Sequence, residues 1–150
     1  MTTLLDTTRT TKLRVLIAED NTADVLLIQD ALREHGVHHE AEVAYDGEEA
    51  FAFLERAGHD SDLVPDLVML DLNLVTHHGT EVLEHIRNTP GLATIPVVVL
   101  TSSNSLSDRQ KVKSLGADLY LRKPLDLVSF LALGEPIAEL LRGRGLALSG

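Results

Sequence analysis

The chain has 150 residues, 44% of them hydrophobic, which is enough for one domain with an ordinary core and too little for two. Its formal charge of -10 repels nucleic-acid phosphates. With only two tyrosines and three phenylalanines, the chain also lacks the alternating aromatic and basic residues of a nucleic-acid-binding surface, so we expect no direct nucleic-acid binding. The absence of cysteine excludes disulfides and thiolate metal sites and favours a reducing, cytoplasmic location, while no apolar run approaches the roughly 20 residues that span a membrane.

The chain begins with MTTLLDTTRTTK, which is rich in threonine and lacks the apolar centre of a signal peptide. We therefore expect residues 1–12 to form a flexible N-terminal arm and residues 13–142 to form a single folded domain. Residues 143–150 contain three glycines and are expected to form a frayed C-terminal tail.

Apolar runs rich in β-branched residues alternate along the chain with segments whose apolar residues recur at helical spacing. The expected strands cover residues 13–20, 39–45, 66–71, 97–101 and 118–124. The expected helices cover residues 21–36, 46–58, 79–88, 105–117 and 125–143, and residues 59–65 form a loop. Pro136 lacks a backbone N–H and should kink or split the last helix near Glu135.

Five strands that alternate with five helices, three of the strands almost entirely apolar, predict an α/β fold with a parallel sheet. Right-handed crossovers leave the doubly wound arrangement as the leading topology. We expect a five-stranded parallel sheet in the flavodoxin-like order 2-1-3-4-5, with helices on both faces.

Polar side chains gather where four of the predicted strands end. These residues are Glu19, Asp20, Asp71, Asn73, Thr101 and Lys123. Ligands of an open parallel sheet bind beyond the carboxyl ends of its strands, so three carboxylates, a hydroxyl and an ammonium would converge there. Each residue alone has an ordinary explanation, because Asp20 could cap a helix, Thr101 could open a turn and Lys123 could be solvated.

The predicted clustering of three negative charges favours a functional site, because helix capping does not require it and like charges raise one another's pKa. Such a cluster calls for a cation, and Mg²⁺ is the hard cation that prefers carboxylate, carbonyl and water oxygens. Three carboxylates are then balanced by Lys123 and Mg²⁺. A neutral site of this kind could accept a phosphoryl group, with Asp71 at its centre as the nucleophile.

The segments LIAEDN, VMLDLNL, VVVLTSS and LYLRKP resemble the four signature segments of the receiver domain of two-component response regulators. Their order and spacing are similar to the family pattern over about residues 13–142, the expected receiver domain. The segments LDLNL and TSSNS and the extension after the last helix are most similar to stand-alone receivers that pair with bacterial phytochrome-type kinases.

The resemblance implies that Asp71 accepts a phosphoryl group from a phosphohistidine of a sensor histidine kinase. The narrower similarity to receivers of phytochrome-type kinases implies that this kinase is a bacteriophytochrome. It also implies Mg²⁺ ligands, namely the carboxylates of Asp20 and Asp71, the backbone carbonyl of Asn73, and Glu19 through a water molecule. Lys123, preceding a cis bond to Pro124, would pair with phosphoryl oxygens.

By the same resemblance, Thr101 would hydrogen-bond the phosphoryl group and Tyr120 would swing inward behind it. These movements would remodel the surface formed by the fourth helix, fifth strand and fifth helix, as a phosphorylation switch does.

Two positions depart from the family pattern after the phosphorylated residue. Val75 stands where proline is common, and His78 with Gly79 replaces a common Asp-Gly pair. The loop VTHHG is therefore expected to be less rigid and less acidic than usual. His77 and His78 could change their charge near neutral pH beside the phosphoryl group, although solvated side chains are the favoured interpretation.

Three other functions would use the same fold or chemistry. A phosphatase of the haloacid-dehalogenase type needs a second aspartate as general acid where this chain has Asn73, so we do not expect an enzyme. A flavodoxin-like carrier needs a phosphate-binding loop, for which only TSSNS is a candidate, and the acids would repel its anionic cofactor. A pseudo-receiver, a binding module without phosphorylation, commonly lacks one of the acids or the lysine, and none is missing here.

We expect no output domain after residue 150, and therefore an output that passes through a partner or a change in self-association. The apolar residues on either side of the Gly134-Glu135-Pro136 segment exceed what one covering helix needs. They predict a homodimer formed through the fourth helix, fifth strand and fifth helix, with burial in the core as the other interpretation.

Overall fold

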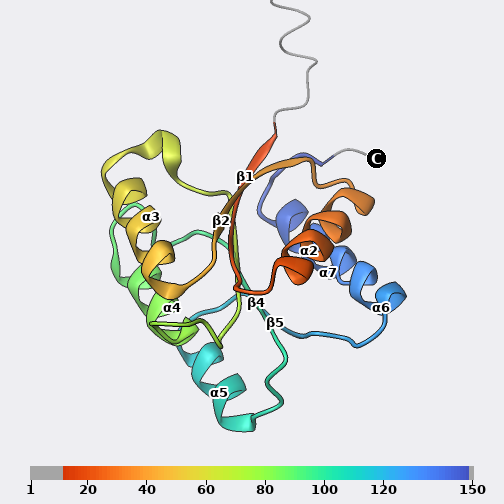
Figure 1. Cartoon of the computed structure of the whole chain (residues 1–150). Coiled ribbons are helices and arrows are strands. Elements are labelled where there is room, and N and C mark those ends of the chain that lie inside the picture. Colours follow the sequence, from red (N-terminus) through yellow and green to blue (C-terminus); the bar gives the residue numbers. More distant parts are fainter. Residues whose placement is uncertain (1–11, 149–150) are drawn as a thin grey trace, which may run out of the picture.

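The computed structural model describes residues 12–148 (Figure 1). The strands are β1 (Leu13–Ala18), β2 (His39–Ala44), β3 (Leu67–Leu70), β4 (Val97–Thr101) and β5 (Leu119–Arg122). The helices are α2 (Thr22–Glu34), α3 (Gly47–His59), α4 (Gly79–Asn88), α5 (Leu106–Ser114), α6 (Leu127–Ala132) and α7 (Gly134–Gly143), with a short 3-10 helix, η1 (Ser61–Leu63), before β3.

The five strands form one parallel sheet in the order β2-β1-β3-β4-β5. Helices α3, α4 and α5 cover one face, and α2, α6 and α7 cover the other (Figure 1). The predicted doubly wound fold and its strand order are therefore confirmed.

Side chains of the central strands are buried on both faces of the sheet. In β1, Leu16 and Ala18 pack under α3 and α4, whereas Val15 and Ile17 pack under α2 and α7. Successive strand residues point to opposite faces, so a strand covered on both sides is apolar throughout. This explains why β3 and β4, at the centre of the sheet, are almost entirely apolar.

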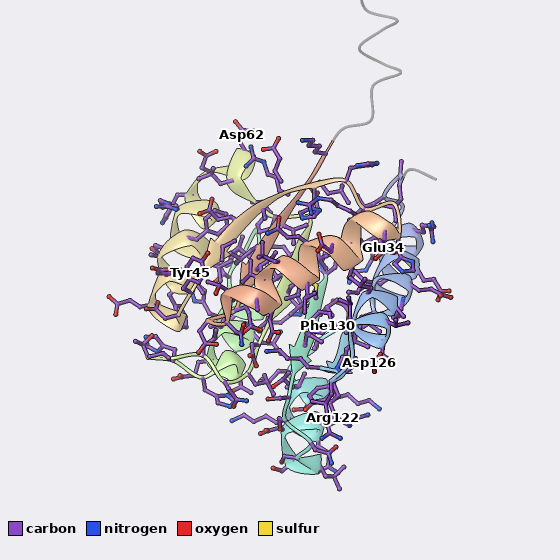
Figure 2. All side chains as sticks on the ribbon, turned by 45° about the vertical axis from the view of Figure 1, so that its right-hand side comes forward. Glu34, Tyr45, Asp62, Arg122, Asp126 and Phe130 are labelled. Carbon is purple, nitrogen blue, oxygen red and sulfur yellow. The ribbon has the colours of Figure 1, made fainter. Side chains whose placement is uncertain are left out.

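The last predicted helix is split into α6 and α7, which meet at Leu133. Pro136 lies in the first turn of α7, where an N–H would have no partner within the helix, so the break precedes the proline. Phe130 of α6 is buried in the core beneath α2, and the three helices α2, α6 and α7 lie side by side on this face (Figure 2).

Residues 144–148 follow α7 and are held against the domain, in contrast to the frayed tail that was expected. The Arg144 guanidinium contacts the Asp118 carboxylate at 2.7 Å and donates to the carbonyl of Thr94 at 3.0 Å. Leu146 and Leu148 pack against the core face that α2 covers. The arm expected at residues 1–12 lies outside the described residues except for Lys12.

Asp118 joins several segments at the amino end of the sheet. Its carboxylate accepts hydrogen bonds from the backbone N–H of Val97 and from Arg87 of α4, at 2.8 and 3.0 Å, and it pairs with Arg144. The Arg87 side chain also donates to the carbonyls of Ala93, Ile95 and Gly116. The Arg87 side chain thus supplies hydrogen-bond donors to loop carbonyls that have no partner in the sheet.

Within the described residues 12–148, no helix combines the length and the apolar character required to cross a membrane.

Gly134 at the start of α7 provides a stability test, because a Cβ there would overlap the carbonyl oxygen of Ala31 and the ring of His35 on α2. We expect Gly134→Ala to lower the free energy of unfolding by about 1–3 kcal/mol through overpacking. Gly143, in the same helix, has open space around it, so Gly143→Ala should be neutral or slightly stabilising. Urea unfolding of both variants measures this, and equal stability of the two would refute the close packing of α7 on α2.

Candidate functional site

The carboxyl ends of β1, β3, β4 and β5 bring the predicted site residues to one edge of the sheet. The hydrogen-bond ladder continues just past the strands, because the N–H of Asp71 donates to Ala18 and that of Lys123 donates to Thr101, at 3.0 and 2.9 Å. These bonds fix the backbone from which the site side chains extend. The structure therefore places Glu19, Asp71 and Lys123 close together.

The ammonium of Lys123 lies at the centre of this arrangement. Its Nζ is 2.7 Å from Glu19 Oε1, 2.9 Å from Asp71 Oδ2 and 2.9 Å from Asp24 Oδ2. Glu19 and Asp71 are buried, so their charges have little access to water. The lysine supplies the positive charge that these carboxylates need.

The carboxylates of Glu19, Asp20 and Asp71 could hold a metal ion. One oxygen from each lies within 4.8 Å of the others, with Asp20 exposed and the other two buried. Asn73 follows Asp71 closely, and its N–H donates to Asp71 Oδ1 at 3.1 Å. A set of three carboxylates beside a backbone turn suits a hard divalent cation such as Mg²⁺.

The pKa values of the two central groups reflect their surroundings. Burial and the neighbouring Asp71 charge raise the pKa of Glu19 to about 7, although contact with Lys123 partly opposes this. Burial by itself lowers the pKa of Lys123, but its contacts with Glu19, Asp24 and Asp71 outweigh burial and hold that pKa above its ordinary value. The lysine is therefore charged, while Glu19 carries an unfavourable charge that a metal ion would stabilise.

Thr101 and Tyr120 are linked through the loop that follows β4. The buried Thr101 hydroxyl accepts a hydrogen bond from the N–H of Ser103 at 3.2 Å, and the Tyr120 hydroxyl donates to the carbonyl of Ser103 at 3.1 Å. The guanidinium of Arg109 lies 4.8 Å from the centre of the Tyr120 ring. The bond between Lys123 and Pro124 is trans, so the cis bond that the resemblance implied is not observed.

The loop between β3 and α4 is anchored to α3 rather than loose. The carbonyl of Val75 accepts from the N–H of Gly47 at 2.8 Å, and the Thr76 hydroxyl accepts from the N–H of Glu48 at 2.9 Å. Both donors belong to the first turn of α3, which lacks partners within its own helix. The sequence predicted a less rigid loop, because these hydrogen bonds to α3 are formed with a distant segment.

Both histidines of this loop contact other residues of the domain. The expectation was that their side chains are surrounded by solvent. His78 is the N-cap of α4, where Nδ1 accepts from the N–H of Thr80 and the His78 N–H donates to the Glu81 carboxylate. His77 packs edge-on against Phe51 of α3, with ring centres 4.8 Å apart. His78 thus takes the capping position that an aspartate commonly occupies.

Asp24 is the site residue that the sequence reasoning missed. It lies in the first turn of α2, four residues after Asp20, and its carboxylate contacts Lys123. The available signal was its place in the first turn of the helix that directly follows the acid pair. The charge balance inferred from the sequence therefore omitted one acid.

Comparison with known proteins agrees with the family resemblance of the four sequence segments. Residues 15–133 match the family model described as response regulator receiver domain. Response regulator Rcp1 of Synechocystis sp. is 40% identical over 124 residues, which cover 82% of this chain and 84% of that protein.

Two solved structures extend the similarity to the fold. The phosphorylated cyanobacterial phytochrome response regulator RcpA is 35% identical, with a TM-score of 0.79 and coverage of 93% of this chain and 100% of that one. The Mn²⁺-bound form of Rcp1 is 33% identical, with a TM-score of 0.73 and coverage of 92% and 99%.

The raised pKa of Glu19 predicts how stability changes with pH in the absence of divalent cations. Between the ordinary value of 4.5 and about 7, the folded protein binds more protons at Glu19 than the unfolded chain does. The free energy of unfolding therefore falls as pH rises through this window, by about 3 kcal/mol for this group.

Urea unfolding in EDTA at several pH values measures this effect as the difference between the wild type and Glu19→Gln. We expect the variant to gain relative stability from about pH 5 to pH 8. The lowered pKa of the buried His39 has the opposite sign but is common to both proteins. A difference that stays constant over this range would contradict the assignment.

Proposed function

The chain belongs to the response regulator receiver domain family, as its four signature segments indicated, and from this premise we propose that it is a phosphorylation switch. Asp71 would accept a phosphoryl group from a sensor histidine kinase. The observation that carries the proposal is the contact between the buried Asp71 carboxylate and the Lys123 ammonium at 2.9 Å, beside a pair of acids. This arrangement offers a nucleophile and a positive charge for phosphoryl oxygens.

The transfer exchanges one bond to phosphorus for another. A carboxylate oxygen of Asp71 attacks the phosphorus of the phosphohistidine, and the imidazole nitrogen leaves with the electron pair of the broken P–N bond. Glu19, Asp20, Asp71 and the carbonyl of Asn73 would hold Mg²⁺, whose charge, when bound, offsets those of the carboxylates and phosphoryl oxygens. Lys123 would pair with a phosphoryl oxygen.

Thr101 and Tyr120 would convert this local charge into a change of surface. When the Thr101 hydroxyl turns to donate to a phosphoryl oxygen, its movement would shift Ser103, whose N–H donates to Thr101 and whose carbonyl accepts from Tyr120. The affected surface is formed by α5, β5 and α6, which correspond to the predicted fourth helix, fifth strand and start of the fifth helix.

The phosphatase and pseudo-receiver alternatives have less support than the switch. The chain has Asn73 where a phosphatase of the haloacid-dehalogenase type needs a general acid, so we propose a phosphoryl acceptor and no multiple-turnover enzyme. The acids and the lysine that pseudo-receivers commonly lose are all present, and Lys123 contacts Glu19 and Asp71.

The cellular partner is proposed from the relatives. The structural neighbour RcpA is described as a cyanobacterial phytochrome response regulator, so we propose a phytochrome-type histidine kinase as the phosphoryl donor, acting in the cytoplasm. The receiver domain would span residues 13–142.

A homodimer is proposed through the surface of α5, β5 and α6. The apolar residues that suggested it, such as Phe130, Ile137 and Leu141, are buried against the domain, so core burial accounts for them. Other apolar side chains are exposed on α5, on α6 and between β5 and α6, namely Leu106, Leu125, Leu127 and Val128. Exposed apolar side chains on these elements would supply the contacts of a twofold interface.

Phosphorylation is tested by incubating the protein with acetyl phosphate and Mg²⁺ and measuring its intact mass. We expect an adduct of about 80 Da, the mass of one phosphoryl group, in the wild type. Asp71→Asn should abolish the adduct, because the nucleophile is lost. The matched control Asp66→Asn removes an acid at the start of the same strand and should still be modified. An adduct that persists in Asp71→Asn would exclude the assignment.

Self-association is tested by light scattering at concentrations on the order of tens of micromolar, with and without beryllofluoride and Mg²⁺. We expect a dimer mass that Val128→Glu reduces to that of a monomer, because a charge would be buried in the interface. Leu26→Glu, on the exposed side of α2, is the control and should remain dimeric. A wild type that is monomeric under both conditions would refute the dimer.

A further inference from the structure

Asp24 is a fourth carboxylate at the site that receives no role in phosphoryl transfer. Its Oδ2 lies 2.9 Å from Lys123 Nζ. Its backbone N–H donates to the N-cap side chain of Asn21 at 3.1 Å, so its position is fixed by the first turn of α2. The contact with the lysine is therefore set by the helix immediately following the acid pair.

Three carboxylate oxygens crowd the Lys123 ammonium, at 2.7 Å for Glu19, 2.9 Å for Asp24 and 2.9 Å for Asp71. The contact with Asp71 is also a hydrogen bond. A phosphoryl oxygen that binds the lysine must therefore compete with these carboxylates for its positive charge.

Asp24 is the partner that is most easily exchanged. Its side chain is 20% exposed, against 2% for Glu19 and 6% for Asp71, so water can solvate it after it releases the lysine. The group of carboxylate oxygens that could hold a metal consists of Glu19, Asp20 and Asp71, without Asp24. Of the three acids that contact the lysine, Asp24 alone is neither a candidate metal ligand nor the residue that would carry the phosphoryl group.

We propose that Asp24 is a positioning residue that holds the Lys123 ammonium over Asp71 in the resting protein and competes with the phosphoryl oxygens for it. The inference rests on the proposed phosphorylation of Asp71. Because the negative charge of Asp24 lies beside the lysine, it weakens the attraction between the lysine and a phosphoryl group. The residue thereby limits how firmly the phosphorylated state is held.

The competition is tested with beryllofluoride, a phosphoryl mimic, titrated at saturating Mg²⁺ and followed by ¹⁹F NMR. Asp24→Asn should tighten the apparent dissociation constant by roughly three- to tenfold, since it removes the competing charge from a partly exposed pair. Asp24→Glu should restore a value near that of the wild type. Asp30→Asn, on the same helix, removes a carboxylate that pairs with Arg33. It controls for net charge and should leave the constant unchanged.

The positioning is tested separately in the resting protein without metal, from the ¹⁵N signal of the Lys123 ammonium. We expect slow proton exchange at this group in the wild type, in Asp24→Glu and in Asp30→Asn, and faster exchange in Asp24→Asn. If Asp24 only stabilised α2, Asp24→Asn would not speed proton exchange at the Lys123 ammonium.

The outcomes separate this inference from the proposed function. If the wild type binds no beryllofluoride in the presence of Mg²⁺, the proposed function fails, and the inference fails with it. If the wild type binds it but Asp24→Asn binds equally well or more weakly, only the role of Asp24 is overturned. Unchanged exchange of the Lys123 ammonium in Asp24→Asn would also overturn that role.

Discussion

The acids at the carboxyl edge of this sheet depend on one ammonium group for their positive counter-charge. Lys123 follows β5 at the edge of the sheet, yet its contacts include Asp71 after β3 and Glu19 after β1, both beyond β4 in the strand order. Unpaired carboxylates this close would repel one another by on the order of a few kcal/mol per pair. The long lysine side chain therefore joins β5 to two strands with which it shares no backbone pairing, and its positive charge offsets the repulsion between the acids.

The fold could be predicted from the sequence because its main determinants are local. The β3 segment is apolar over its whole length, since both faces of the sheet are covered, and the acids at the strand ends mark the edge where a parallel sheet exposes its carboxyl ends. Glu19, Asp20, Asp71 and Lys123 could be grouped for the same reason, because the topology brings strand ends together. Pro136 likewise indicated a helix break close to the one observed.

The features that escaped prediction depend on packing between distant segments. The tail could not be placed because Arg144 is held by Asp118, 26 positions earlier, and periodicity carries no information on such a pair. Asp24 resembled an ordinary acid in the first turn of a helix, and only the three-dimensional position of Lys123 distinguishes it. The capping role of His78 was not expected because histidine is not among the preferred N-cap residues, and its hydrogen-bond partners are evident only from the three-dimensional structure.

The position of Ser103 has a consequence for the time scale of switching. Its N–H and its carbonyl, which belong to adjacent peptide units, face Thr101 and Tyr120 respectively. In the proposed switch, a signal that passes from Thr101 to Tyr120 would require rotation about the backbone of this single loop residue. Loop motions of this kind take nanoseconds to microseconds, on the order of magnitude known for proteins. The lifetime of the active surface would then be governed by the chemistry of the acyl phosphate, because the conformation follows it almost without delay.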